Sequence, residues 1–181
     1  ESGNNPKVRY KKDDLMINNT MVLNNILSHR MNPAQFLEAA KALVYVSREH
    51  TTRPAIFYMG GTPLNEVIIA SMDIVDDFKR KNRLEVVNTI FLTDGDSTPL
   101  RSYMNASYDE SIVREYVKLN GVYHQNKVVL TDPVTKFQVE YHTDGVKAET
   151  SALFKLMRLR TNCNVIGFYI LSRYEVDREL T

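Results

Sequence analysis

The fold expected for this chain is decided by the stretch Asn88-Thr89-Ile90-Phe91-Leu92-Thr93-Asp94-Gly95-Asp96. With Val86 and Val87 before it, the stretch opens as a short apolar run rich in β-branched and aromatic residues, which predicts a strand buried on both faces. A run of the same character over 164–171 predicts a second buried strand. The polar loop that begins at Thr93 would then leave the carboxyl end of the first strand, where open parallel sheets bind ligands.

Helical periodicity precedes each of the two predicted strands. Apolar residues recur at spacings of three and four over 63–80 and again over 148–160, as they do in helices that bury one face. An insertion at about 99–147 separates the first strand from the second helix, and it contains a predicted hairpin around the turn Asp132-Pro133-Val134-Thr135. The fold class expected is α/β, with a partial doubly wound, Rossmann-like parallel sheet, flanking helices and an inserted hairpin.

Residues 1–59 are expected to form a mostly helical N-terminal segment ahead of a core over 60–181. Two helices are predicted in this segment. The first carries apolar residues on one face, namely Leu23, Ile26 and Leu27. The second begins at Asn32-Pro33, because asparagine is a good N-cap and proline suits the first helical position.

Composition narrows the classes of function. The chain has 23 Lys and Arg against 22 Asp and Glu, a net charge of +1, so it lacks the basic excess that is typical of nucleic-acid-binding domains. No apolar run approaches the roughly 18 residues that span a bilayer. The single cysteine, Cys163, rules out an internal disulfide framework and a cysteine-rich zinc site. We therefore expect neither nucleic acid nor membrane as a partner, and a reducing, cytoplasmic compartment.

Two loops carry the residues that could do chemistry. The first is Gly60-Gly61-Thr62-Pro63-Leu64, where Thr62 stands at the N-cap position of the helix over 63–80. A capping role would by itself account for this threonine, since its hydroxyl can accept a hydrogen bond from a free backbone N–H. The second is Thr93-Asp94-Gly95-Asp96-Ser97-Thr98, whose carboxylates and hydroxyls form a hard oxygen set suited to Mg²⁺. A solvated Asp-Gly turn is the alternative interpretation of this loop.

Together the two loops resemble the second and third metal-site motifs of von Willebrand factor A (VWA) domains. In that family a threonine from a Gly-Gly-Thr-Pro-Leu type loop and an aspartate from a Thr-Asp-Gly type loop help to form a metal-ion-dependent adhesion site. Thr62 and Asp94 stand at the matching positions, with a helix and a strand between them. Within that family, the chain resembles the VWA proteins of tailed bacteriophages and of the cobaltochelatase-subunit type.

This resemblance implies a function in binding another protein, without catalysis by the chain itself. It implies a Mg²⁺ site that uses Thr62, Asp94 and Asp96, and a partner AAA+ ATPase of the MoxR type, acting in remodelling or assembly. The compartment implied is the cytoplasm, or the host cytoplasm if the chain is encoded by a phage.

One departure from the family pattern affects the metal site. VWA domains take their first ligands from an Asp-x-Ser-x-Ser motif, which no part of this chain contains. The nearest match, Asp109-Glu110-Ser111-Ile112-Val113, has the wrong last residue and comes after the other motifs. The chain is therefore expected to begin inside a VWA domain and to bind Mg²⁺ weakly or not at all, because Mg²⁺ gives up its own waters reluctantly.

Two other functions fit the same residues. The string from Asp94 to Thr98 also resembles the Asp-x-Asp-x-Thr signature of haloacid-dehalogenase-like phosphatases, in which Asp94 would be the nucleophile and Asp96 the acid/base, with Mg²⁺ holding the phosphate. That motif normally lies near the start of its domain, whereas here it follows a long N-terminal stretch. The third possibility is an interaction module that binds no metal.

Overall fold

The structure is a computed structural model of the chain. It describes residues 15–16, 21–48, 61–98, 100–104, 115–118, 127–142 and 146–170. Gly60 and the near-match at 109–113 lie outside the described residues. The chain divides into two compact units, one of Thr20–Gly61 and the other of Glu1–Asn19 with Thr62–Thr181.

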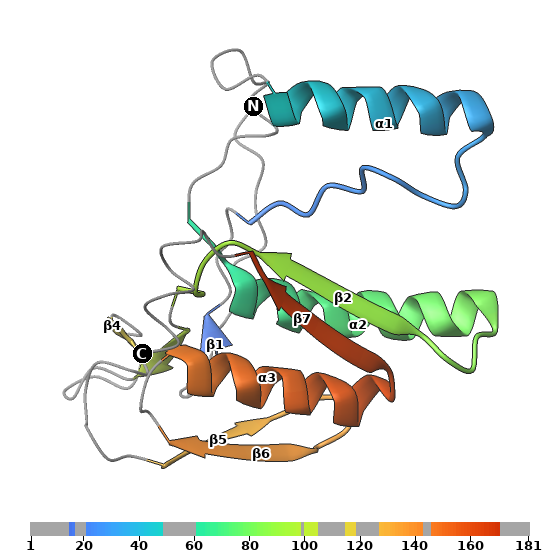
Figure 1. Cartoon of the computed structure of the whole chain (residues 1–181). Coiled ribbons are helices and arrows are strands. Elements are labelled where there is room, and N and C mark those ends of the chain that lie inside the picture. The colour runs from blue at the N-terminus through green and yellow to red at the C-terminus, as the bar shows by residue number, and fades with distance from the viewer. Residues whose placement is uncertain are drawn as a thin grey trace, which may run out of the picture. The chain divides into compact units, whose positions relative to one another are not determined.

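The larger unit contains a pair of parallel strands (Figure 1). Strand β2, Asn88–Thr93, pairs with β7, Asn164–Tyr169, in an unbroken register that ends with Thr93 opposite Tyr169. Both strands are rich in β-branched and aromatic residues, which pack well on a pleated surface. The mixed α/β class and the short parallel sheet are confirmed.

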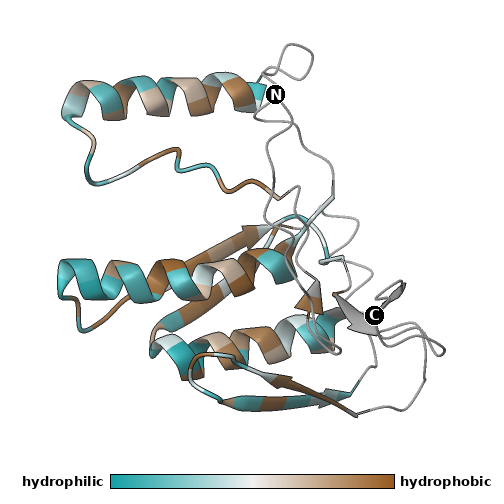
Figure 2. Ribbon diagram, turned by 180° about the vertical axis from the view of Figure 1, so that it is seen from behind, coloured by the Kyte–Doolittle hydropathy of each residue, from teal (hydrophilic) through white to brown (hydrophobic). Residues whose placement is uncertain are grey.

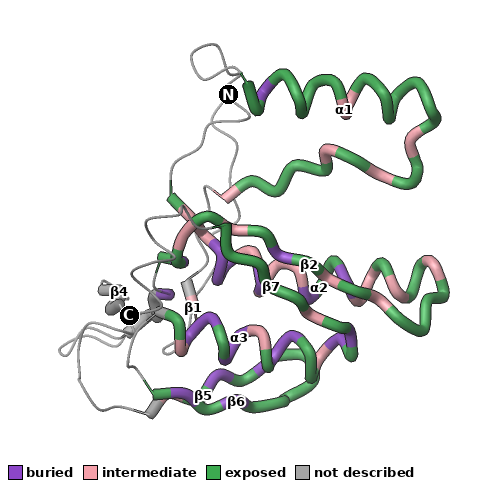
Figure 3. Tube along the Cα trace, viewed as in Figure 1, coloured by how far each residue is buried: buried purple, intermediate pink, exposed green. Residues whose placement is uncertain are grey.

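Two helices cover one face of this strand pair. Helix α2, Leu64–Asn82, packs against α3, Val146–Thr161, and both contribute to a core that includes Phe91 of β2. The ring of Phe91 meets that of Phe154 edge to face, with centroids 5.2 Å apart. The buried positions of α2 recur at helical spacing (Figure 3): Leu64, Ile68, Met72 and Val75. Both predicted helices are confirmed, and their ends differ from the prediction by one or two residues.

The opposite face of the strand pair is exposed, although both strands consist largely of hydrophobic residues (Figure 2). Ile90 and Leu92 of β2, with Ile166 and Phe168 of β7, are between 41% and 68% exposed. The prediction that these strands are buried on both faces is therefore wrong for the part of the chain that the structure describes. The physical reason is that α2 and α3 both pack on the side of Phe91.

Antiparallel strands lie in the insertion between β2 and α3. Strand β3, Arg101–Met104, pairs with β4, Glu115–Lys118, and with the short β1, Leu15–Met16. Strands β5, Lys127–Thr131, and β6, Gln138–His142, form the predicted hairpin, which is confirmed. The hairpin packs against α3, so apolar side chains of β5 and β6 join the same core.

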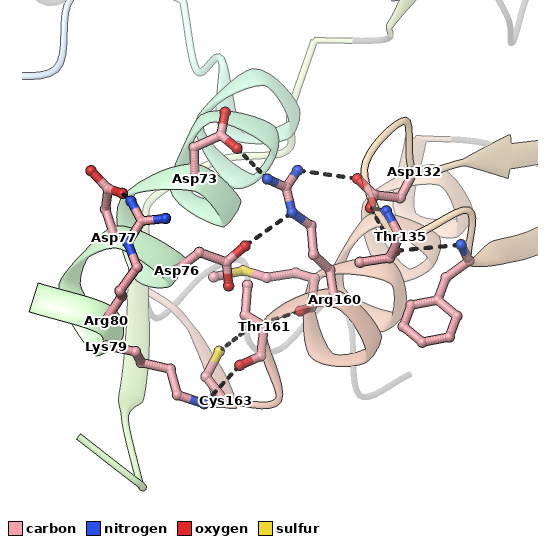
Figure 4. A network of polar contacts seen from close by, with 12 residues as sticks. Asp73, Asp76, Asp77, Lys79, Arg80, Asp132, Thr135, Arg160, Thr161 and Cys163 are labelled. Carbon is pink, nitrogen blue, oxygen red and sulfur yellow. Dashed lines mark hydrogen bonds and ion pairs between the residues drawn. The ribbon is translucent and has the colours of Figure 1, made fainter. Parts of the chain in front are cut away.

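Arg160 fastens the hairpin to the two helices (Figure 4). Its side chain is 8% exposed and pairs with Asp132 of the hairpin turn at 3.1 Å, with Asp76 of α2 at 3.2 Å, and with Asp73. Asp132 is 1% exposed and also accepts hydrogen bonds of 2.6 Å from the amide and the hydroxyl of Thr135. Burial alone would raise the pKa of Asp132, but the bonds from Thr135 and the charge of Arg160 outweigh it and hold the pKa below its ordinary value.

The smaller unit contains helix α1, Pro33–Arg48. The side chain of Asn32 accepts a hydrogen bond of 2.9 Å from the amide of Gln35, and the side chain of Gln35 accepts one of 3.0 Å from the amide of Asn32. This reciprocal pair is a capping box, and it confirms the predicted start of the helix. None of the helices in the described part of the chain is both long enough and apolar enough to cross a bilayer.

The helix predicted around Leu23, Ile26 and Leu27 is wrong, because residues 21–27 form no regular element. The chain turns just after them at Ser28. The hydroxyl of Ser28 accepts a hydrogen bond from the Arg30 amide and its carbonyl accepts one from the Met31 amide. Such local bonds compete with helical ones.

Candidate functional site

The carboxyl ends of β2 and β7 meet at one edge of the parallel pair. Thr93 stands opposite Tyr169 in the register, and beyond it the Ile170 amide donates to the Thr93 carbonyl at 2.8 Å. The predicted loop over 94–98 leaves from this edge. Its position therefore agrees with the expected place of ligand binding in a parallel sheet.

Thr93 shapes the first turn of this loop. Its hydroxyl donates to the Gly95 carbonyl at 2.8 Å and accepts from the Gly95 amide at 3.3 Å, a local pairing that is typical of threonine turns. Asp94 and Asp96, on either side of Gly95, are both exposed. The two carboxylates are thus presented to solvent from a turn that the backbone defines.

Thr62 lies against the same loop. Its carbonyl accepts a hydrogen bond of 3.1 Å from the amide of Thr98. A Cβ placed on Gly95 would lie 3.4 Å from the Thr62 hydroxyl oxygen, so this hydroxyl is adjacent to the residue that separates Asp94 from Asp96. The structure therefore brings together the two loops that carry the predicted site residues.

The donor set at this edge is small and consists of oxygen. A hydroxyl and two carboxylates are the ligand types that Mg²⁺ prefers, and the ion keeps several waters when the protein offers few ligands. Among the residues that the structure describes, no group of three or more His, Cys, Asp or Glu side chains could hold a metal. The residues present fit Mg²⁺ in their chemistry, with few protein ligands to bind it.

The charge of Asp96 affects the pKa of Tyr169, the last residue of β7. Burial raises the pKa of Tyr169, and the negative charge of Asp96 adds to this rise, while the charge of Lys147 lowers the pKa. Since Lys147 belongs to the first turn of α3, the start of that helix lies within electrostatic reach of the same edge.

The predicted capping role of Thr62 is wrong. Helix α2 begins at Leu64, and Pro63 occupies the N-cap position. The side chain of Pro63 makes no capping hydrogen bond. The Asn65 amide instead donates to the hydroxyl of Ser97 at 2.9 Å. The loop after β2 thus caps α2 from outside the helix, and the Thr62 hydroxyl does not serve as the cap.

Sequence reasoning missed a buried polar network next to this cap. One carboxyl oxygen of Glu149, in the first turn of α3, accepts hydrogen bonds from the Leu100 amide at 2.7 Å and from the Asn65 side chain at 2.6 Å. Its other oxygen accepts from the Tyr141 hydroxyl at 3.5 Å. Glu66 is buried nearby, and its Oε2 has no hydrogen-bond partner. An acid in a first helical turn usually complements the helix dipole, so no local pattern indicates that Glu149 is buried.

Burial raises the pKa of Glu149 above its ordinary value of 4.5. The charge of Glu66 adds to the rise, whereas the bonds from Leu100, Asn65 and Tyr141 oppose it. Because the folded chain holds this proton more tightly than the unfolded chain, Glu149 lowers the stability progressively as the pH rises from about 4.5 through the raised pKa.

We expect Glu149→Gln to remove this pH dependence. The amide keeps an oxygen that can accept the bonds from Leu100 and Asn65 but cannot ionise. Relative to the wild type, the variant should gain free energy of unfolding as the pH is raised from 4 to 8, as measured by urea denaturation at each pH. A constant difference between the two proteins across this range would contradict the raised pKa.

No protein-family model, curated protein or solved structure matches the chain.

Proposed function

We propose that the chain is a VWA-like protein-binding module whose adhesion site lies at the carboxyl edge of β2 and β7. Thr62, Asp94 and Asp96 would hold Mg²⁺ there. The observation that carries the proposal is the contact between the two loops, in which the Thr62 carbonyl accepts from Thr98 and the Thr62 hydroxyl lies beside Gly95. The phosphatase alternative gives Thr62 no role, so it leaves this contact unexplained.

The surrounding elements support a partial doubly wound sheet. A parallel strand pair, a helix before each strand and a polar loop at the carboxyl edge are parts of such a fold, which would also need helices on the face that is exposed here. In a VWA domain further strands and an Asp-x-Ser-x-Ser loop would complete both the sheet and the metal site. The chain would then supply part of the ligands, and its own affinity for Mg²⁺ would be low.

The bound ion would supply a coordination position for a carboxylate of the partner protein. Thr62 and the two aspartates would orient the ion, and the exposure of Asp94 and Asp96 leaves the outer side of the loop open to that partner. We propose a MoxR-type AAA+ ATPase as this partner, with ATP hydrolysis performed by the ATPase and a cytoplasmic location for the complex.

The test measures Mg²⁺ binding and partner capture with the same variants. We expect calorimetric titration of the chain with Mg²⁺ or Mn²⁺ to give a weak signal that Thr62→Ala and Asp94→Ala each reduce by about tenfold or more. Mg²⁺-dependent capture of a purified MoxR-type ATPase should fall with them. Glu85→Gln is the matched control, since Glu85 is an exposed acid outside both loops.

Three outcomes would contradict the proposal in different ways. A silent titration would favour an interaction module without metal. Capture that is unchanged in EDTA would exclude a bridge through the ion. Mg²⁺-dependent hydrolysis of an aryl phosphate that Asp94→Asn abolishes would favour the phosphatase.

A further inference from the structure

Glu149 links the two loops of the proposed site through hydrogen bonds. Its Oε1 accepts one hydrogen bond from Leu100, just after the loop over 94–98, and one from Asn65, just after Thr62. Both bonds are shorter than 2.8 Å, in the range of charge-assisted hydrogen bonds. A single carboxyl oxygen therefore holds the backbone at Leu100, which follows the Asp94 loop, close to the side chain of Asn65, which follows the Thr62 loop.

Asn65 makes three hydrogen bonds in this arrangement, including the one to Glu149. Its side-chain oxygen accepts a bond of 2.7 Å from the Thr150 hydroxyl, and its backbone amide donates to the Ser97 hydroxyl. The side chain of Asn65 is fully buried, as is that of Glu149. The network thus links α2, the loop after β2 and α3 at one point, and it leaves little freedom for the loops to separate.

Burial of Glu149 costs free energy, because its carboxyl group is removed from water. An apolar residue would not avoid a cost, because it would leave the Leu100 amide and the Asn65 side chain without an acceptor. The second oxygen of Glu149 has only the long contact with Tyr141, and Glu66 beside it has an unpartnered oxygen. What Glu149 provides in return is a fixed separation between two segments that are distant in sequence.

We propose that Glu149 is a positioning residue that sets the distance between Thr62 and the Asp94 loop. This inference rests on the proposed function, because the contacts of Glu149 would matter for function only if Thr62 and Asp94 bind a cation. Outer residues that orient metal ligands typically change metal affinity by 10–100-fold when they are replaced. Glu149 would act in this way through Asn65 and Leu100, without contacting the ion.

The experiment separates the geometry of Glu149 from its charge. Glu149→Gln keeps an acceptor at the same reach but is neutral, whereas Glu149→Asp keeps the charge and withdraws the carboxylate by one methylene group. Titration of the full chain with Mn²⁺ should give an affinity close to the wild type for Gln and about tenfold weaker for Asp. If the charge of Glu149 attracts the ion directly, the order is reversed and the proposal is overturned.

A second measurement tests the positioning without any metal. Amide hydrogen exchange should accelerate by about tenfold or more at Thr98 in Glu149→Asp, because the bond from Thr98 to Thr62 is released. The amides in the middle of α3 should keep their wild-type rates. Uniform acceleration across the unit would show a merely structural role, and unchanged exchange at Thr98 would refute the positioning.

The two proposals can fail separately. A wild-type chain that binds no Mn²⁺ contradicts the proposed function, and the exchange at Thr98 still decides whether Glu149 holds the loops together. If Glu149→Asp does not fold, Thr150→Val removes the hydroxyl that donates to Asn65 with little change in shape. Its Thr98 exchange is then expected to rise, and wild-type exchange in a folded Thr150→Val chain overturns the proposal.

Discussion

Replacing Arg160 with alanine is expected to lower the free energy of unfolding by about 3–5 kcal/mol. The guanidinium is largely buried and is the cation that pairs with Asp132, which is fully buried in the hairpin turn. Its loss leaves that carboxylate in the interior without a countercharge. It also releases Asp73 and Asp76, so the hairpin loses its link to α2. Urea denaturation followed by circular dichroism would measure the change.

Two further variants show whether the buried charge is the cause. Arg80→Ala also removes an arginine paired with an aspartate, Asp77, but both side chains are exposed, so its unfolding midpoint should stay close to the wild type. Asp132→Asn in the Arg160→Ala background removes the orphaned charge and should recover part of the loss. If Arg160→Ala is no more destabilising than Arg80→Ala, the network contributes little to the fold.

The elements that the sequence predicted correctly are those with a local signature. The period of three and four in α2, the Asn32-Pro33 start of α1 and the turn around Asp132 each depend on residues within a few positions of one another. Hydrophobic periodicity, capping and turn chemistry act over that range. The loops at Thr62 and Asp94 were found in the same way, by their composition and their place beside predicted elements.

Apart from the helix predicted around Leu23, which local bonds at Ser28 replace, the errors and omissions involve partners distant in the chain. Ser97 caps α2 in place of Thr62 because the fold brings the loop after β2 to the start of that helix. The roles of Glu149 and Arg160 depend likewise on contacts with other elements. Periodicity identifies a strand but does not say how many layers cover it, which is why the exposed face of β2 was not foreseen.

Phe91→Ala is expected to cost about 3–5 kcal/mol, the usual range for removing a buried aromatic ring. Phe91 is 8% exposed and packs edge to face on Phe154 of α3. The cavity would open between the strand pair and the helices, where the core side chains of both α2 and α3 converge. The midpoints of thermal and urea unfolding should both decrease. Phe91→Leu keeps most of the side-chain volume, so its free energy of unfolding should lie between those of Phe91→Ala and the wild type.

Leu92→Ala is the matched control, because it removes a large apolar side chain from the adjacent residue on the opposite face. Leu92 is 68% exposed, so its replacement should change the free energy of unfolding by about 0.5 kcal/mol or less. The ratio of the two losses therefore measures how one-sided the burial of β2 is. A loss for Leu92→Ala as large as that for Phe91→Ala would mean that the face of Ile90 and Leu92 is covered in solution, and that the chain has a second apolar layer.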